Sequence, residues 1–204
     1  MVSIEFLFTS LIVVLVPGAG VLCTVTAGLT QGRIASLHTA LGCTIGIVPH
    51  LLATVLGLAA ILHTSAVAFQ VLKFAGVAYL LYLAYATWRD REAFVLDETV
   101  TRSGALNLIL KSMLINTLNP KLTIFFMAFL PQFVVPGAAP GVLQLLGLSA
   151  VFMAMTFVVF VGYGCLAHAF RQGVVESPRV QAWLRRGFSG AFAGLGVQLA
   201  LSDR

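Results

Sequence analysis

The stretch SMLINTLNPKLTIFFMAFLPQFV, residues 112–134, decides the fold class of this chain. It has the length of a membrane-spanning helix, which needs about 20 mainly apolar residues to cross a hydrocarbon core of about 30 Å. Yet four polar or helix-breaking residues interrupt it, namely Asn116, Asn119, Pro120 and Lys121. A proline removes one backbone donor and obstructs the carbonyl four residues earlier, which leaves polar groups unpaired where no water is available. We therefore expect a helix that is broken inside the membrane and faces a cavity or other protein.

The rest of the chain shares this apolar character. Of its 204 residues, 59% are hydrophobic and 9% are charged, whereas about a quarter are charged in ordinary globular proteins. The apolar stretches are hydrophobic all round and show no period of two, which favours helices over a transmembrane barrel. The sequence thus predicts an all-α polytopic membrane protein, a single domain over residues 1–204 with six transmembrane helices. Their expected ranges are 6–28, 39–62, 69–88, 113–135, 142–170 and 184–201.

The basic residues between the spans predict an orientation. They form no patch interleaved with aromatic residues, so the net charge of +5 does not indicate a nucleic-acid partner. By the positive-inside rule, the first, third and fifth loops are cytoplasmic and both termini lie outside. Nine basic residues fall on the cytoplasmic side, against Lys73 and Arg204 on the other. The nine are Arg33, Arg89, Arg91, Arg102, Lys111, Arg171, Arg179, Arg185 and Arg186.

The two halves of the chain have the same predicted organisation. The polar segment 89–111 falls near the middle and is expected to be a cytoplasmic linker between two three-helix halves, 1–88 and 112–204. With three spans in each half, the halves insert with opposite orientation. This is the pattern of an inverted repeat, in which discontinuous helices meet near the bilayer midplane.

Both opening helices are interrupted at corresponding places. The first is broken at VPGAG, with Pro17, Gly18 and Gly20, and the second is broken 103 residues later at Pro120. Each new half-helix begins with exposed N–H groups and a partial positive charge, which suit a carboxylate. For either break alone, a simple packing kink is the alternative.

Lys121 is expected inside the membrane. If it sat at the interface, the apolar remainder 122–135 would have 14 residues, which span about 21 Å and are too short to cross. A cation in the membrane costs at least about 2.5–3.5 kcal/mol, so it normally faces an internal cavity or a partner. The alternative is a side chain that snorkels to the cytoplasmic surface past Asn116 and Asn119.

His50, just after Pro49, lies near the middle of the second span. Because histidine changes its charge near neutral pH, it is a candidate proton carrier or substrate hydrogen-bond donor. Equally, it can be a neutral histidine bonded to a backbone carbonyl. No Asp or Glu lies within a span, so an acidic proton relay is missing; Glu5, at the outer edge of the first span, is the second proton-coupling candidate.

Other residues exclude several classes of function. Cys23, Cys43 and Cys165 lie in apolar spans at wide separations, which excludes an extracellular disulfide framework and a metal-ligand pattern. We interpret them as buried small side chains. Without a carboxylate or clustered histidines in a span, an enzyme is not expected. Two further motifs, Gly42-x-x-x-Gly46 and Gly190-x-x-x-Gly194, fit close helix packing within the bundle or in a homodimer.

Three segments resemble the LysE/RhtB-type family, the bacterial lysine and homoserine/threonine exporters, and are most similar to its homoserine/threonine branch. They are VPGAGVLCTVTAGLTQGRIASLHTALG (16–42), AFQVLKFAGVAYLLYLAYATWR (68–89) and NTLNPKLTIFFMAFLPQFV (116–134). The resemblance implies an exporter in a bacterial inner membrane, with periplasmic termini, that is driven by the proton motive force without ATP or a bound cofactor. By position it implies site residues Pro17, Gly18, Gly20, Asn116, Asn119, Pro120, Lys121, Pro131 and Gln132, with His50 matching the branch histidine. Two residues depart from the pattern: Ala19 stands where many members have proline, and Ile47 where many have an acid.

The predicted function is secondary active export of small amino acids or derivatives, such as threonine, homoserine or homoserine lactone, by alternating access. Half-helix N-termini and Lys121 would hold the substrate carboxylate, while unwound backbone carbonyls and Asn116 or Asn119 would take the ammonium group. One alternative is a membrane thiol-disulfide electron carrier, but this chemistry needs a reactive cysteine in each half, and Cys23 has no counterpart in residues 112–135. Another is a transporter of the same architecture for a different class of substrate.

Overall fold

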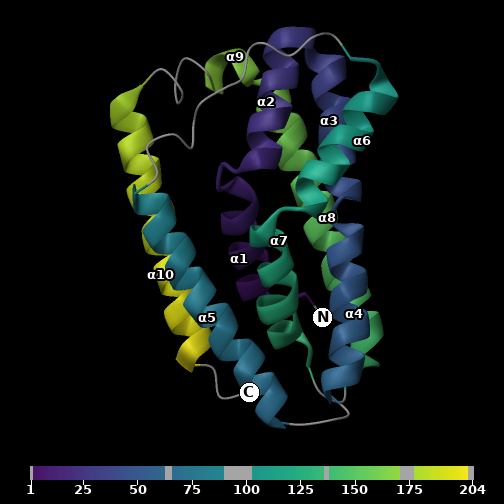
Figure 1. Cartoon of the computed structure of the whole chain (residues 1–204), viewed down its shortest axis with the longest axis vertical. Coiled ribbons are helices and arrows are strands. Elements are labelled where there is room, and N and C mark those ends of the chain that lie inside the picture. The colour runs from purple at the N-terminus through teal and green to yellow at the C-terminus, as the bar shows by residue number, and fades with distance from the viewer. Residues whose placement is uncertain (1, 63–65, 90–102, 136–137, 171–176, 202–204) are drawn as a thin grey trace.

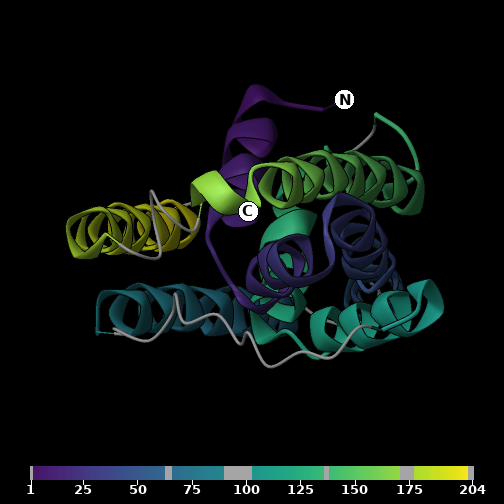
Figure 2. The ribbon, with the colours of Figure 1, turned by 90° about the horizontal axis from the view of Figure 1, so that it is seen from above.

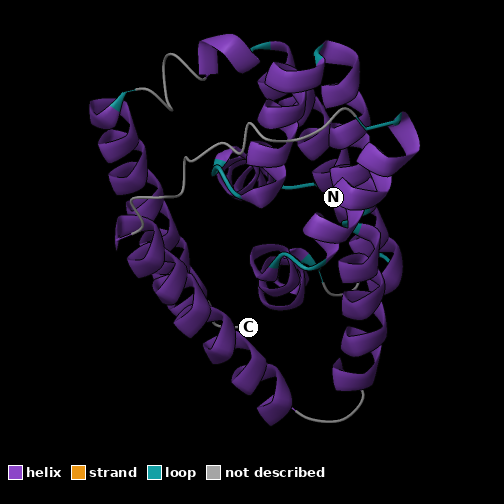
Figure 3. Cartoon of the chain, turned by 45° about the horizontal axis from the view of Figure 1, so that its top comes forward, coloured by secondary structure: helices purple, strands orange, loops and turns teal. Residues whose placement is uncertain are grey.

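The computed structural model describes residues 2–62, 66–89, 103–135, 138–170 and 177–201. The regular elements in these ranges are all helical, which confirms the all-α prediction (Figure 3). In chain order they are α1 (Ile4–Leu15), α2 (Ala19–Gln31), α3 (Arg33–Ile45), α4 (Val48–Leu62), α5 (Ala66–Arg89), α6 (Ala105–Thr117), α7 (Pro120–Ile124), the π-helical turn η1 (Phe125–Phe129), the 3₁₀ turn η2 (Leu130–Phe133), α8 (Gly141–Cys165), α9 (Ala167–Phe170) and α10 (Pro178–Leu201).

Both predicted helix breaks are present. The chain bends by 56° between α1 and α2, and by 60° between α6 and the segment that starts at Lys121. At the first break Gly18, in extended backbone, precedes α2 without a side-chain cap. At the second, the side chain of Asn119 caps α7 by accepting a hydrogen bond from the Lys121 N–H at 3.1 Å. The two breaks therefore have the same cause, a proline, and different caps.

Fewer than six segments qualify as membrane spans on their own. Among the described residues, 33–57 and 141–165 are long and apolar enough to cross a membrane, and each bent pair also qualifies if it counts as one span. Helices α5 and α10 have 24 residues each, or about 36 Å at 1.5 Å per residue, but they are not among these segments. The count of six and the inverted repeat remain predictions.

Several boundaries differ from the predicted ones. Helix α6 begins at Ala105, so the linker predicted at 89–111 ends earlier, and Lys111 lies exposed on a helix. The span predicted at 39–62 is interrupted by a turn at Gly46 and Ile47, and the one predicted at 142–170 by Leu166. Hydropathy misplaces these limits for two reasons. A helix can extend beyond its apolar stretch, and a turn can interrupt the helix inside an apolar stretch.

The turn between α2 and α3 requires glycine. Gly32 has a φ of +89°, a left-handed backbone conformation that glycine adopts without steric cost. This single residue reverses the chain so that α2 and α3 pack against each other. Arg33 follows immediately and begins α3.

The helix ends that carry basic residues lie in the upper part of Figure 1. There α3 begins at the top, α10 begins at the upper left and α5 ends below the start of α10; in the sequence these ends carry Arg33, Arg179 and Arg89. Helices α5 and α10 form a pair along one side (Figure 2). Within it the Ser189 hydroxyl donates to the Ala84 carbonyl at 2.7 Å.

Gly42 and Gly46 allow α3 to lie directly on the backbone of α6. A Cβ atom at Gly42 would overlap the hydroxyl of Ser112 and the carbonyl of Ile109, and one at Gly46 would lie 2.6 Å from the carbonyl of Met113. Close packing by this motif is therefore observed. Nothing lies within 4 Å of a Cβ at Gly190 or Gly194 among the described residues, so that motif does not pack here, and its role in a homodimer remains a prediction.

Replacing Gly42 by valine is expected to destabilise the protein strongly. Overpacking typically costs about 1–3 kcal/mol, and here the obstacle includes backbone, which cannot rotate away. Thermal unfolding in detergent, followed by size-exclusion chromatography, should show a lower melting temperature or no folded protein. Gly190→Val is the matched control, since the space around that glycine is open. Equal melting temperatures of the two variants would contradict the packing described above.

Candidate functional site

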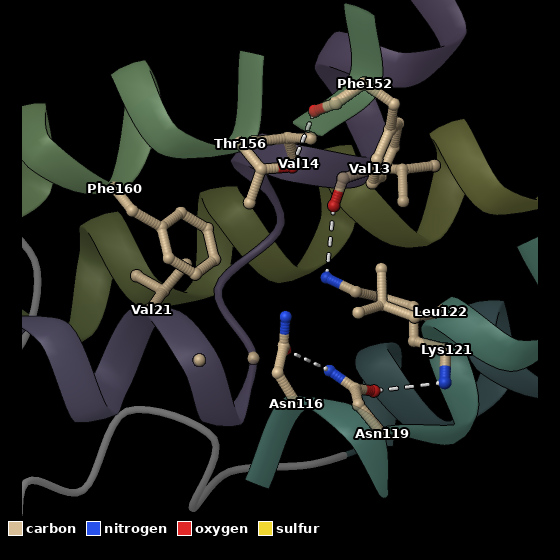
Figure 4. Close-up of a pocket in the computed structure, with 12 residues that line it drawn as sticks. Val13, Val14, Val21, Asn116, Asn119, Lys121, Leu122, Phe152, Thr156 and Phe160 are labelled. Atoms are coloured by element: carbon tan, nitrogen blue, oxygen red, sulfur yellow. Dashed lines mark hydrogen bonds between the residues drawn. The ribbon is translucent and has the colours of Figure 1, made fainter. Parts of the chain in front are cut away.

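The two helix breaks face one another and enclose a pocket (Figure 4). Its free space is about 310 Å³ when the open mouth is included. The lining comes from both breaks and from α8. It consists of Val13, Val14, Gly18, Gly20, Val21, Asn116, Asn119, Lys121, Leu122, Phe152, Thr156 and Phe160.

Lys121, from the second half of the chain, hydrogen-bonds the unpaired carbonyls at the first break. Its Nζ donates to the carbonyl of Val13 at 3.0 Å and to that of Val16 at 3.1 Å. In an unbroken helix the Val13 carbonyl would bond the N–H of residue 17, but that residue is Pro17, which has none. The ammonium group thus takes the place of the missing donor, and it also lies at the negative end of α1. The Lys121 side chain points toward the first break and is half-buried.

His50, from the first half of the chain, hydrogen-bonds the backbone at the second break. The carbonyl of Asn116 would bond the N–H of residue 120 in an unbroken helix, and that residue is Pro120. The His50 Nε2 lies 3.1 Å from this carbonyl instead, which also accepts the Asn119 N–H at 3.1 Å. Each break is therefore completed by a basic side chain from the other half.

The hydrogen-bond partners of His50 indicate which of its ring nitrogens carries a hydrogen. A carbonyl only accepts, so Nε2 carries a hydrogen toward Asn116. The Nδ1 atom lies 3.2 Å from the hydroxyl of Thr123, which is also 3.4 Å from the Asn119 carbonyl. With this tautomer Nδ1 can accept from the Thr123 hydroxyl, and the predicted bond to a backbone carbonyl is present.

Asn116 connects the pocket to α3. Its Nδ2 donates to the Cys43 carbonyl at 2.6 Å, and its Oδ1 lies 3.5 Å from the Asn119 Nδ2. Asn116 is 2% exposed, and its side chain lines the pocket beside Gly20. A Cβ on Gly20 would lie 2.9 Å from the ring of Phe160 and 3.1 Å from Asn116 Oδ1. Only glycine lets α2 approach so closely.

The remaining predicted site residues lie elsewhere. Pro17 is half-buried in the first break, and Pro120 begins α7, although its side chain lies outside the described part. Gln132 lies in η2 and is not among the residues that line the pocket. Glu5 is exposed in the first turn of α1, about 12 Å along the helix from Val13 at 1.5 Å per residue.

Sequence reasoning missed the contribution of α8 and of Thr123. Phe152, Thr156 and Phe160 are spaced by four and therefore share one helix face. Because α8 is apolar all round, no polar stripe marked that face. Lys73, counted above with the outer charges, is 5% exposed within α5, so it is a second buried cation.

The cysteines differ from their predicted burial. Cys43 is buried, Cys23 is partly buried and Cys165 is exposed, so the prediction is wrong for Cys165, which ends α8. All three are free thiols. Among the described residues, none of the pocket-lining side chains is a cysteine, and no group of His, Cys, Asp or Glu is arranged to hold a metal ion.

Comparison with known proteins identifies the family. The family model named LysE type translocator matches residues 11–203. The chain belongs to this family. The LysE-type resemblance is thereby confirmed, and so is the prediction that the protein is not an enzyme, since members of the family are transporters. A thiol-disulfide electron carrier is no longer the leading alternative.

Relatives of this LysE-type translocator extend over nearly its whole length. An "uncharacterized membrane protein" of Vibrio cholerae is 32% identical over 199 residues, which cover 98% of this chain and 96% of the relative. A homoserine/homoserine lactone efflux protein of Salmonella typhimurium is 30% identical over 195 residues, with 96% and 94% covered. A leucine efflux protein of Klebsiella pneumoniae is 25% identical over 207 residues, with 97% and 93% covered. No solved structure matches the chain.

Proposed function

We propose that this translocator exports small amino acids or close derivatives from the cytoplasm, driven by the proton motive force. The observation that carries the proposal is the pocket between the breaks, which brings an ammonium group, a helix N-terminus and helix C-terminal carbonyls together. An amino acid needs both a cationic and an anionic partner, and this pocket offers both. The names of the Salmonella and Klebsiella relatives support an amino-acid substrate.

The carboxylate is best placed at the start of α2, beside Lys121. The first intrahelical bond of α2 runs from the Leu22 N–H to the Gly18 carbonyl at 3.0 Å, so the preceding N–H groups have no acceptor within the helix. No side chain caps this end, whereas Asn119 caps α7. A Cβ at Gly18 would lie 3.5 Å from Lys121 Nζ, so the ammonium group lies against the same helix end. Of the two half-helix N-termini predicted for this role, we therefore favour that of α2.

The substrate ammonium group is best placed at the end of α1. Lys121 now occupies the carbonyls of Val13 and Val16. When Lys121 turns to the carboxylate, the substrate ammonium group replaces it at these carbonyls, with Asn116 Oδ1 as a further acceptor. This exchange keeps the carbonyls of the broken helix satisfied throughout, which the low dielectric of the membrane requires.

The pocket favours a small neutral side chain. Its walls are largely apolar, formed by Val21, Leu122 and Phe160, and Thr156 adds one hydroxyl. We propose threonine, homoserine or homoserine lactone as substrates, with leucine as the second candidate because of the apolar walls and the Klebsiella relative. Glu5 and Gln132 lie away from this pocket, so we assign them no direct contact with substrate.

The same proposal covers location and assembly. We place the protein in the bacterial inner membrane as one domain of six spans in two inverted halves, with the basic helix ends in the cytoplasm and both termini in the periplasm. The collection of Arg33, Arg89 and Arg179 at one end supports this orientation. Rocking of the halves about the pocket would alternate access, and the open glycines of α10 are the surface we propose for a homodimer.

Uptake into inverted membrane vesicles tests the proposed function. Labelled homoserine, threonine and leucine are supplied under an imposed proton gradient, with and without an uncoupler. We expect accumulation of at least one of them that the uncoupler abolishes and that needs no ATP. Vesicles that accumulate none of the three at a rate above protein-free controls would contradict the proposal.

A further inference from the structure

Two buried hydroxyls of the described residues have no hydrogen-bond partner. Ser10 of α1 and Ser149 of α8 are each 0% exposed, and neither Oγ has a partner. Other buried hydroxyls donate to the carbonyl four residues earlier: Thr24 to Gly20 at 2.8 Å, Thr39 to Ala35 at 3.0 Å, Ser112 to Leu108 at 2.7 Å and Thr156 to Phe152 at 2.9 Å. An unpaired hydroxyl is costly inside a membrane protein, so these two serines call for an explanation.

Both serines lie on the helix faces that line the pocket. Ser10 precedes Val13 and Val14 by three and four residues, and Ser149 precedes Phe152 by three; residues at these spacings share one face. Helices α1 and α8 pack against each other. Each serine is therefore about one helical turn, or about 5 Å, beyond the pocket, toward the start of its helix.

An aromatic cluster packs around Phe152 at the wall of the pocket. Phe152 stacks on Phe125 at 4.8 Å between ring centroids and meets Phe126 edge-on at 5.3 Å, while Phe129 stacks on Phe125 at 5.9 Å. All four rings are at most 4% exposed. Three of them belong to the π-helical turn η1, a rare element that is frequent at functional sites. Phe152 also lines the pocket, so this cluster forms part of the pocket wall.

We propose that the substrate leaves the pocket between α1 and α8, on the side away from the basic helix ends, and that Ser10 and Ser149 bind it there once the cluster of Phe125, Phe126, Phe129 and Phe152 opens. The inference rests on the proposed function. A hydroxyl both donates and accepts, so the pair can serve the carboxylate and the ammonium group of an amino acid. The substrate then provides the hydrogen-bond partners that the two hydroxyls lack in the closed state.

This role has a signature that a structural role lacks. Replacing either serine by alanine removes an unpaired polar group, so the melting temperature stays the same or rises. Export, in contrast, is slowed. Ser189 provides the matched control, because its hydroxyl is bonded to the Ala84 carbonyl away from the route; Ser189→Ala should lower the melting temperature and leave the transport rate unchanged.

The test measures wild type, Ser10→Ala/Ser149→Ala and Ser189→Ala in the same uptake assay and the same melts. For the double variant we expect a transport rate about tenfold lower, equivalent to about 1.4 kcal/mol at the transition state, without loss of melting temperature. An unchanged rate, or a rate that falls together with the melting temperature, overturns the route while the proposed function stands. If the wild type moves no amino acid, the proposed function fails, and the route fails with it.

A second measurement follows the opening itself. Ser149→Cys is introduced after Cys23, Cys43 and Cys165 are replaced by serine, and a membrane-impermeant thiol reagent is added from the face that the termini occupy. We expect labelling to rise several-fold when labelled homoserine and a proton gradient are supplied. Labelling that stays at the level of the resting protein during measured transport overturns the route.

Discussion

Replacing Lys121 by methionine is expected to lower amino-acid transport by about 10- to 100-fold, because the variant loses the charge-assisted contact to the substrate carboxylate, which is worth about 1.5–3 kcal/mol. Methionine retains much of the length and apolar stem of lysine but cannot donate to the carbonyls of Val13 and Val16 or to a carboxylate. The measurement is the initial rate of labelled homoserine uptake into inverted vesicles. Some loss of stability is also expected, since the end of α1 loses its donor.

The control for Lys121→Met is Lys111→Met. Lys111 is exposed on α6, so its replacement changes the net charge equally without touching the pocket, and transport should remain near the wild-type rate. Size-exclusion profiles of both variants separate a folding defect from a transport defect. Full transport by a folded Lys121→Met protein would remove this residue from the mechanism.

Replacing His50 by glutamine is expected to uncouple transport from the proton gradient. The glutamine amide can donate to the Asn116 carbonyl and accept from Thr123, so the second break stays satisfied, but it cannot carry a proton. We expect gradient-driven accumulation to fall by at least about tenfold, because a positioned proton-transfer group typically contributes about 10²–10⁴-fold. Exchange of labelled for unlabelled substrate, which needs no net proton movement, should persist.

Two variants serve as comparisons for His50→Gln. His38→Gln is the matched control, because His38 is only partly buried on α3 and is not among the residues that line the pocket; it should accumulate substrate like the wild type. Glu5→Gln tests the other proton-coupling candidate. If Glu5→Gln abolishes accumulation and His50→Gln does not, the coupling role moves to Glu5.

The helix breaks could be predicted from the sequence because their cause is local. Pro17 and Pro120 remove a backbone donor wherever they stand in a helix, and the length of the apolar remainder placed Lys121 inside the membrane. What completes each break depends on tertiary structure. Lys121 meets Val13 across 108 residues of chain, and His50 meets Asn116 across 66. Nothing in the local sequence marks such partners.

Other features were missed because apolar sequence carries little directional information. The pocket face of α8 has no polar border, so Phe152 and Phe160 could not be distinguished from lipid-facing aromatic residues. The sequence counts Lys73, near the start of the span predicted at 69–88, with the charges of the outer side, because a charge near the end of a span usually marks the membrane surface. Its burial follows from the packing of α5 against the rest of the bundle, which only the structure reveals.

In the proposed mechanism, the pocket between the two breaks binds an amino acid, and Lys121 is the partner of its carboxylate. The most direct measurement is equilibrium binding of labelled homoserine, threonine and leucine to purified wild type and Lys121→Met. Loss of a charged hydrogen bond predicts an affinity at least about tenfold weaker in the variant for the amino acid that the wild type binds best. Equal affinity of the two folded proteins would contradict the claim.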